Sequence, residues 1–144
     1  MRHVRAAGRS AVVPLAAATL LLTSTAPAQA RTAGFDSDPF QISGAGASAS
    51  GGVSWSHDSD PRVMRGALSG QLSYNGGGGC ARLSVEWLSG DASTLRSAGR
   101  TACAGSSTDL SLDYSSPALQ CVRIRLVVNG NEVGDSRMLC AGGS

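Results

Sequence analysis

Short runs in which apolar and polar residues alternate dominate the chain from Phe40 onward. The alternation is clearest in two segments, whose apolar positions are Ala81, Leu83, Val85 and Trp87 in the first and Val122, Ile124, Leu126 and Val128 in the second. A period of two is that of a β-strand with one buried face. Both segments are therefore expected to be core strands.

Eight such runs are separated by Gly, Ser, Asn or Asp, and they predict strands at residues 40–43, 48–56, 63–74, 81–88, 95–103, 109–114, 119–128 and 132–140. Residues 31–144 show no helical period with caps, and their Gly and Ser content disfavours helix. Many short strands with regular turn signals predict one all-β domain over residues 40–144. The expected fold is an antiparallel β-sandwich, immunoglobulin-like in layout, with a jelly roll or small barrel as the alternative.

The four cysteines fall at the ends of two predicted hairpins. The segment that begins with Cys80 resembles the segment that begins with Cys121. Turn residues lie midway between Cys80 and Cys103 and midway between Cys121 and Cys140. Residues equidistant from a turn lie opposite one another, which predicts the disulfides Cys80–Cys103 and Cys121–Cys140. The main rival pairing joins Cys80 to Cys121, like an inter-sheet bridge. On the strand alternation the cysteines share the polar side, so the disulfides are expected on the outer face or at the ends of the sandwich.

The second hairpin contains a register conflict. If Cys121 faces Cys140 in an unbroken ladder, then Ile124 faces Arg137 and Leu126 faces Asp135. A bulge near Gly134 that shifts one strand by a residue would remove this conflict. The first hairpin has a milder form of it, with Leu83 opposite Arg100.

The first thirty residues have the pattern of a secretory signal peptide. Arg2, Arg5 and Arg9 precede an apolar run at 11–22, and Ala28-Gln29-Ala30 fits a small-x-small cleavage site. Cleavage after Ala30 predicts a secreted, extracellular protein without a membrane span, and retention by an uncleaved leader is the alternative. Residues 31–39 are polar and are expected to form a flexible segment.

Removal of the leader changes the charge of the chain. Three of the twelve basic residues lie in the leader, which leaves nine against all ten acidic residues. Nucleic-acid binding requires clustered positive charge, so nucleic acid is not expected as a partner. Arg82, Arg123 and Arg125 share one face of the predicted sheet and form a candidate anion-binding patch, although Glu86 and solvent are the simpler partners.

One compact polar cluster, His57-Asp58-Ser59-Asp60-Pro61, joins two predicted strands. Asp58 and Asp60 lie two residues apart and, with His57, could offer ligands to a cation. The simpler interpretation is a loop in which Asp60-Pro61 begins the turn. Zinc is not expected, because no two cysteines have the C-x-x-C spacing.

Catalysis is not expected, because His57 is the only histidine after the leader and no Gly-x-Ser-x-Gly elbow is present. The run of glycines at 76–79 lacks a P-loop lysine or dinucleotide pattern, so no cofactor is expected and plain flexibility is favoured. The residues predict a monomeric, secreted, non-enzymatic binding or interaction module whose partner is an extracellular protein or polysaccharide.

Two other functions stay open at this point. Size, four cysteines and β-rich character also suit an inhibitor of an extracellular hydrolase, either a protease or an amylase, with its inhibitory loop at 90–95 or 104–108. A carbohydrate-binding module would require an exposed aromatic platform, and Trp55, between two serines, is the candidate. Trp87 is instead expected to pack at the edge of the sandwich.

Overall fold

The computed structural model describes residues 37–143 and contains eight β-strands. The expected leader at 1–30, with its cleavage site, lies outside the described residues. In chain order the strands are β1 (Ser37–Gly44), β2 (Ala47–His57), β3 (Met64–Tyr74), β4 (Cys80–Ser89), β5 (Thr94–Cys103), β6 (Ser106–Ser116), β7 (Leu119–Val128) and β8 (Asn131–Cys140). Within these residues there is no long apolar helix of the kind that crosses a bilayer.

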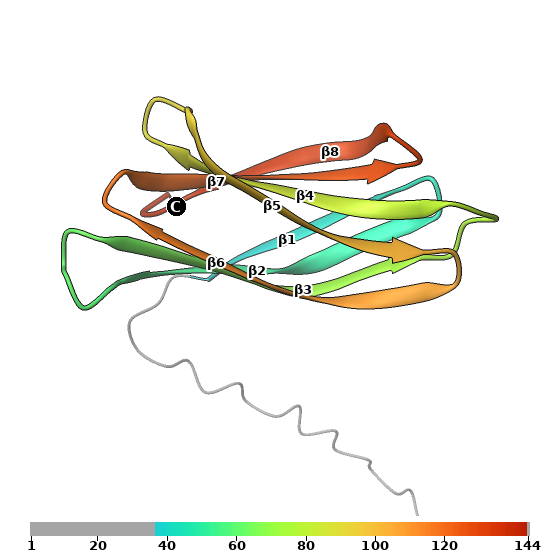
Figure 1. Ribbon diagram of the computed structural model, residues 1–144, viewed down its shortest axis with the longest axis horizontal. Helices are drawn as coiled ribbons and strands as arrows, with labels where there is room; N and C mark the ends of the chain where they lie inside the picture. The colour runs from blue at the N-terminus through green and yellow to red at the C-terminus, as the bar shows by residue number, and fades with distance from the viewer. Residues whose placement is uncertain (1–36, 144) are drawn as a thin grey trace, which may run out of the picture. The chain divides into compact units, whose positions relative to one another are not determined.

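The strands form two four-stranded antiparallel sheets that pack face to face as two layers (Figure 1). The first sheet has the order β1-β2-β3-β6 and the second has the order β5-β4-β7-β8. In an immunoglobulin-like sandwich, strands A-B-E and C′-C-F-G have the same order as β2-β3-β6 and β5-β4-β7-β8. The predicted sandwich is therefore confirmed, with β1 as an additional strand on the first sheet.

The core lies between the two sheets and follows the predicted alternation. Every apolar position of the two clearest runs is buried, and Trp87 has no exposed surface. The first sheet contributes Leu68, Leu72 and Tyr74 from β3 and Leu110 from β6. A fully buried aliphatic side chain of this kind contributes about 2 kcal/mol to stability. Hydrophobic burial from both sheets thus holds the layers together.

Both predicted disulfides are present, and the rival Cys80–Cys121 pairing is wrong. Cys80 lies directly opposite Cys103 in the β4–β5 ladder, and Cys121 lies opposite Cys140 in the β7–β8 ladder. All four cysteines are at least partly exposed, as their place on the polar side predicts. Each disulfide therefore ties an edge strand of the second sheet to a central strand.

The predicted bulge is present in β8, but it shifts the register by two residues. Ile124 pairs with Arg137, and the next pair along the ladder is Leu126 with Val133. Gly134 lies in the irregular segment with a φ of 69°, a left-handed conformation that strongly favours glycine. The bulge places Val133 opposite Leu126, while Arg137 remains opposite the buried Ile124.

The first strand begins earlier than predicted. β1 includes residues 37–39, which pair with β2, so the expectation of a flexible segment is wrong for these three residues. The side chain of Asp38 accepts a hydrogen bond from the indole Nε1 of Trp55 at 3.2 Å. Local composition predicted a loop because these residues are polar, whereas pairing to β2 supplies the order. Residues 31–36 lie outside the described part.

Candidate binding surfaces

The His57–Asp60 cluster ends β2 and continues into the exposed loop before β3. An oxygen of Asp58 accepts a hydrogen bond from the backbone N–H of Ser59 at 2.7 Å, and an oxygen of Asp60 accepts one from that of Arg62 at 2.9 Å. These carboxylates thus stabilise the turn of their own loop. Among residues 37–143, no three His, Cys, Asp or Glu side chains come together as a metal-binding group.

Trp55 is buried, so the expectation that it forms an exposed platform is wrong. It is 6% exposed, and its ring packs edge-on against Trp87 with centroids 6.4 Å apart. Trp87 in turn stacks on Tyr114. The signal was in the sequence, because Trp55 has the same strand parity as Ala47, Ala49 and Val53, which are also buried. The flanking serines obscured this alternation.

The glycine loop before β4 is held more firmly than its composition predicted. The hydroxyl of Tyr74 donates to the carbonyl of Gly78 at 2.7 Å, and Gly76 lies against the Tyr74 ring so closely that a Cβ would be 2.3 Å from it. The backbone N–H of Asn75 donates to the carbonyl of Gly46. These contacts anchor the loop to the neighbouring turn, and the glycines serve close packing as well as flexibility.

The arginines on the outer face of the second sheet largely pair with acids. Glu86, whose side chain is 16% exposed, contacts Arg123 at 3.3 Å and Arg125 at 2.5 Å. Arg125 also lies 3.9 Å from Glu132. Two of the three residues in the candidate anion-binding patch are therefore already neutralised. This outcome agrees with the simpler interpretation of that patch.

One side of the sandwich, where β5 and β6 are the edge strands, is closed by side chains. Arg100 donates to the carbonyl of Ser111 at 3.2 Å, and the hydroxyl of Thr108 donates to the carbonyl of Thr101 at 3.1 Å. The inward-facing Arg100 opposite Leu83 thus extends across the edge to the first sheet. Two backbone carbonyls at this edge, those of Thr101 and Ser111, are therefore bonded within the molecule.

The other side, where β1 and β8 are the edge strands, contains a surface pocket. We call it the β1–β8 seam, defined by Gln41, Ile42, Ser43, Gly134, Asp135 and Arg137. These residues line a pocket of about 220 Å³. In the described residues no hydrogen bond joins β1 to β8. The two sides of the same sandwich therefore differ in how their edges are satisfied.

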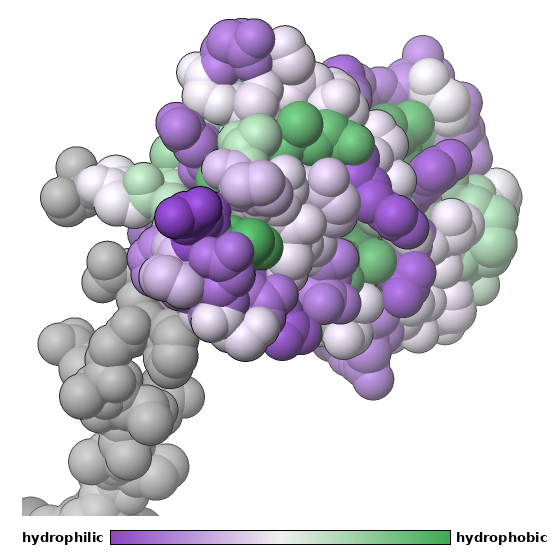
Figure 2. Space-filling model, turned by 60° about the vertical axis from the view of Figure 1, so that its left-hand side comes forward, coloured by the Kyte–Doolittle hydropathy of each residue, from purple (hydrophilic) through white to green (hydrophobic). Residues whose placement is uncertain are grey.

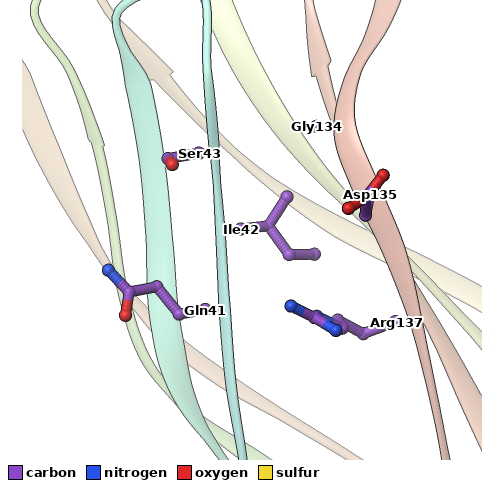
Figure 3. Close-up of a pocket in the computed structure, with 6 residues that line it drawn as sticks. All are labelled: Gln41, Ile42, Ser43, Gly134, Asp135 and Arg137. Atoms are coloured by element: carbon purple, nitrogen blue, oxygen red, sulfur yellow. The ribbon is translucent and has the colours of Figure 1, made fainter.

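The seam is narrow at one end and wide at the other. A Cβ on Gly134 would lie 2.7 Å from the carbonyl oxygen of Ser43, so the strands touch at this point. Figure 3 shows the guanidinium of Arg137 extending from β8 toward β1, with the carboxylate of Asp135 pointing elsewhere. Within residues 37–143, Arg137 forms no ion pair. The wide end thus presents a cation beside an edge strand.

The β4–β5 turn is the most internally bonded loop at the end of the sandwich that contains Cys121–Cys140. Its Ser89 N–H donates to the Ser93 carbonyl at 3.0 Å, and its Asp91 carboxylate accepts hydrogen bonds from the Ser89 hydroxyl and the Ser93 N–H. These hydrogen bonds, that of Ser89 foremost, lower the pKa of Asp91. Leu88, just before the turn, pairs with Cys121, so a disulfide flanks the turn.

The exposed surface offers little apolar area. On the face in Figure 2, hydrophobic residues form small separate spots among polar ones. Met138, at 51%, is the only large hydrophobic side chain in the described part that is exposed. Recognition by a broad apolar patch is therefore not favoured. No protein-family model, curated protein or solved structure matches this chain.

Proposed function

We propose that this chain is a secreted, non-enzymatic binding module for an extracellular partner. The observation that carries the proposal is the difference between the two sides of the sandwich. The β5–β6 side is closed by hydrogen bonds within the molecule, whereas the β1–β8 seam leaves an edge strand, a pocket and a guanidinium exposed. An exposed strand edge invites pairing with another chain, and natural proteins usually cover it.

The position of the disulfides supports this proposal. Both lie in the second sheet and fix its two edge strands, β5 and β8, to the centre. A rigid β8 keeps Arg137 in place on one side of the seam, which lowers the entropy lost on binding. Two disulfides are also compatible with an oxidising, extracellular environment, in agreement with the signal-peptide pattern of residues 1–30.

The non-enzymatic part of the proposal rests on the sequence, in which His57 is the only histidine after residue 30. This histidine lies at the exposed end of β2, and in the described structure its imidazole has no hydrogen bond to a serine or a carboxylate. A general base must lie within hydrogen-bond reach of its nucleophile. We therefore propose that His57, the last residue of β2, leads into the loop that follows this strand, and we assign it no catalytic role.

Affinity capture tests the proposal. The oxidised protein, immobilised through its C-terminus, is incubated with culture fluid of the producing cells, and bound proteins are identified by mass spectrometry. We expect a protein that free oxidised module displaces and that binds the module with saturable stoichiometry in calorimetry. A reduced and alkylated sample is the control. Recovery of the same proteins on both samples would contradict the proposal.

A hydrolase inhibitor is the second candidate, and the β4–β5 turn favours it. The turn is exposed, carries several internal hydrogen bonds and lies beside the Cys121–Cys140 disulfide. An inhibitory loop needs this rigidity to bind without losing conformational entropy. Purified protein assayed against secreted proteases and amylases should then slow one of them, and a turn variant such as Asp91→Ala should weaken that effect. Full activity of every enzyme in the panel would exclude these enzymes as targets of inhibition.

A carbohydrate-binding function has lost its support. It depended on Trp55 as an exposed platform, and this side chain is buried against Trp87 and bonded to Asp38. Stacking on a sugar requires an open ring face. We therefore do not propose this function.

A further inference from the structure

The edge of β1 that faces the seam has a defined set of free backbone groups. Ala45 and Gly46, the two residues between β1 and β2, have φ values of 49° and 79°, which identifies a two-residue type I′ hairpin. The residues that flank such a turn, Gly44 and Ala47, form a hydrogen-bonded pair, and bonded and non-bonded pairs alternate from there. Ile42 and Phe40 therefore bond to β2.

The alternate residues of β1 direct their backbone groups away from β2 and toward the seam. These residues are Ser43, Gln41, Pro39 and Ser37. Gly134 already covers Ser43, and Pro39 has no N–H to donate. Between Ser43 and Pro39 the free edge is therefore short, and Gln41 offers both its N–H and its carbonyl. A short edge of this kind admits a few residues of a partner and resists extended sheet-to-sheet aggregation.

Arg137 lies on the core-facing side of β8, opposite the buried Ile124, and yet it is exposed. Arg137 is the last regularly paired residue of β8 next to the irregular segment that contains Gly134, because the register shifts between the pairs Ile124–Arg137 and Leu126–Val133. Figure 3 shows the guanidinium projecting across the seam toward the strand that contains Gln41. A guanidinium here would pair with a carboxylate that enters between the sheets.

We infer that the β1–β8 seam binds an extended peptide segment that adds to the edge of β1 and places an acidic side chain on Arg137. This inference rests on the proposed binding function and names the chemistry of the partner. Side chains of an added strand alternate between faces, so one acidic residue would point into the seam while its neighbours point to solvent. Backbone bonds to Gln41 would fix the register, and the ion pair would select the sequence.

Titration with a matched pair of peptides tests the inference. The probes are acetyl-Thr-Val-Glu-Val-Thr-amide and the same peptide with Gln in place of Glu, added to the isotope-labelled, oxidised chain and followed by nuclear magnetic resonance. We expect backbone amide shifts at Gln41 and Ser43. The Glu peptide should bind about tenfold more tightly, because hydrogen bonds between charged groups are roughly twice as strong as neutral ones.

Three variants make the result specific. Arg137→Gln should bring the two peptides to equal affinity, whereas Arg62→Gln, an exposed arginine in the β2–β3 loop, should leave the tenfold difference intact. Gln41→Pro removes one edge N–H and should weaken both peptides by at least tenfold. Amide spectra of each variant show whether the sandwich is retained, and Arg137→Gln changes only an exposed side chain.

Several results would overturn the inference. These are equal affinities of the two peptides for the unmodified chain, no shift at Gln41 with either peptide at millimolar concentration, or shifts centred on Arg123 and Arg125. Dimerisation in sedimentation runs that Gln41→Pro abolishes would assign the edge to a second copy. If affinity capture yields a partner that Arg137→Gln still binds fully, the module proposal stands and the seam inference fails.

Discussion

The close contact between Gly66 and two tryptophans yields the sharpest stability prediction. A Cβ at Gly66 would lie 2.5 Å from Cζ3 of Trp87 and 3.1 Å from Cζ3 of Trp55. Carbon atoms in proteins pack at about 3.5–4.0 Å, so the Trp87 ring would have to move by about 1 Å. Trp87 is fully buried, packs edge-on against Trp55 and stacks on Tyr114. No open space is available to absorb this movement.

We therefore expect Gly66→Ala to destabilise the domain by about 3 kcal/mol, the upper end of the usual cost of overpacking. Urea unfolding of the oxidised protein, followed by far-ultraviolet circular dichroism, measures this change as a shift of the midpoint at constant slope. Gly77→Ala is the matched control, because a Cβ there meets nothing within 4 Å. Its effect should be within about 0.5 kcal/mol.

A double-mutant cycle identifies the cause. In a Trp87→Leu background the ring is gone, so Gly66→Ala should be neutral or stabilising by about 0.5 kcal/mol, because Ala loses less backbone entropy than Gly in a strand. The sign of the effect then reverses between the two backgrounds. If Gly66→Ala costs the same with and without Trp87, the steric explanation is wrong.

Three further predictions concern other parts of the sandwich. Removal of either disulfide by paired Cys→Ala changes should lower the free energy of unfolding by about 3 kcal/mol, because the sequence separations of 23 and 19 close loops of similar entropy. Urea titration measures the loss for each double variant. A difference above about 2 kcal/mol between the two double variants would contradict the loop-entropy explanation. Asp38→Ala should cost about 1–3 kcal/mol because it leaves the Trp55 indole N–H unpaired, whereas Asp38→Asn should cost less because it keeps an acceptor. The pKa of Asp91 is lowered in the folded state, so its carboxylate stabilises the fold at pH values above the ordinary aspartate pKa of about 3.9. This stabilisation is lost as the pH falls through the lowered pKa. The protection of the Ser93 amide against exchange, relative to the intrinsic exchange rate at each pH, should therefore fall below about pH 4, and Asp91→Asn should remove that pH dependence. An unchanged profile in the variant would show that another group is responsible.

The amino-acid sequence is sufficient to predict the strands, their buried faces and the disulfides. A period of two assigns faces from neighbouring residues alone, which is why Leu83, Val85 and Ile124 were placed in the core correctly. Equal distance from a turn likewise pairs Cys80 with Cys103. The conflict between Ile124 and Arg137 indicated a bulge near Gly134, because a register is testable from the two strands of one hairpin.

The contacts between the two sheets follow only from the three-dimensional arrangement of the strands. The hydrogen bond from Arg100 to Ser111 joins β5 to the opposite sheet, and the pocket of the seam lies where residues of β1 and β8 come together. The burial of Trp55 likewise required Trp87 from the other layer. Hydrogen-bonding and packing partners from different sheets are set by the arrangement of the whole sandwich, and local alternation contains no information about that arrangement.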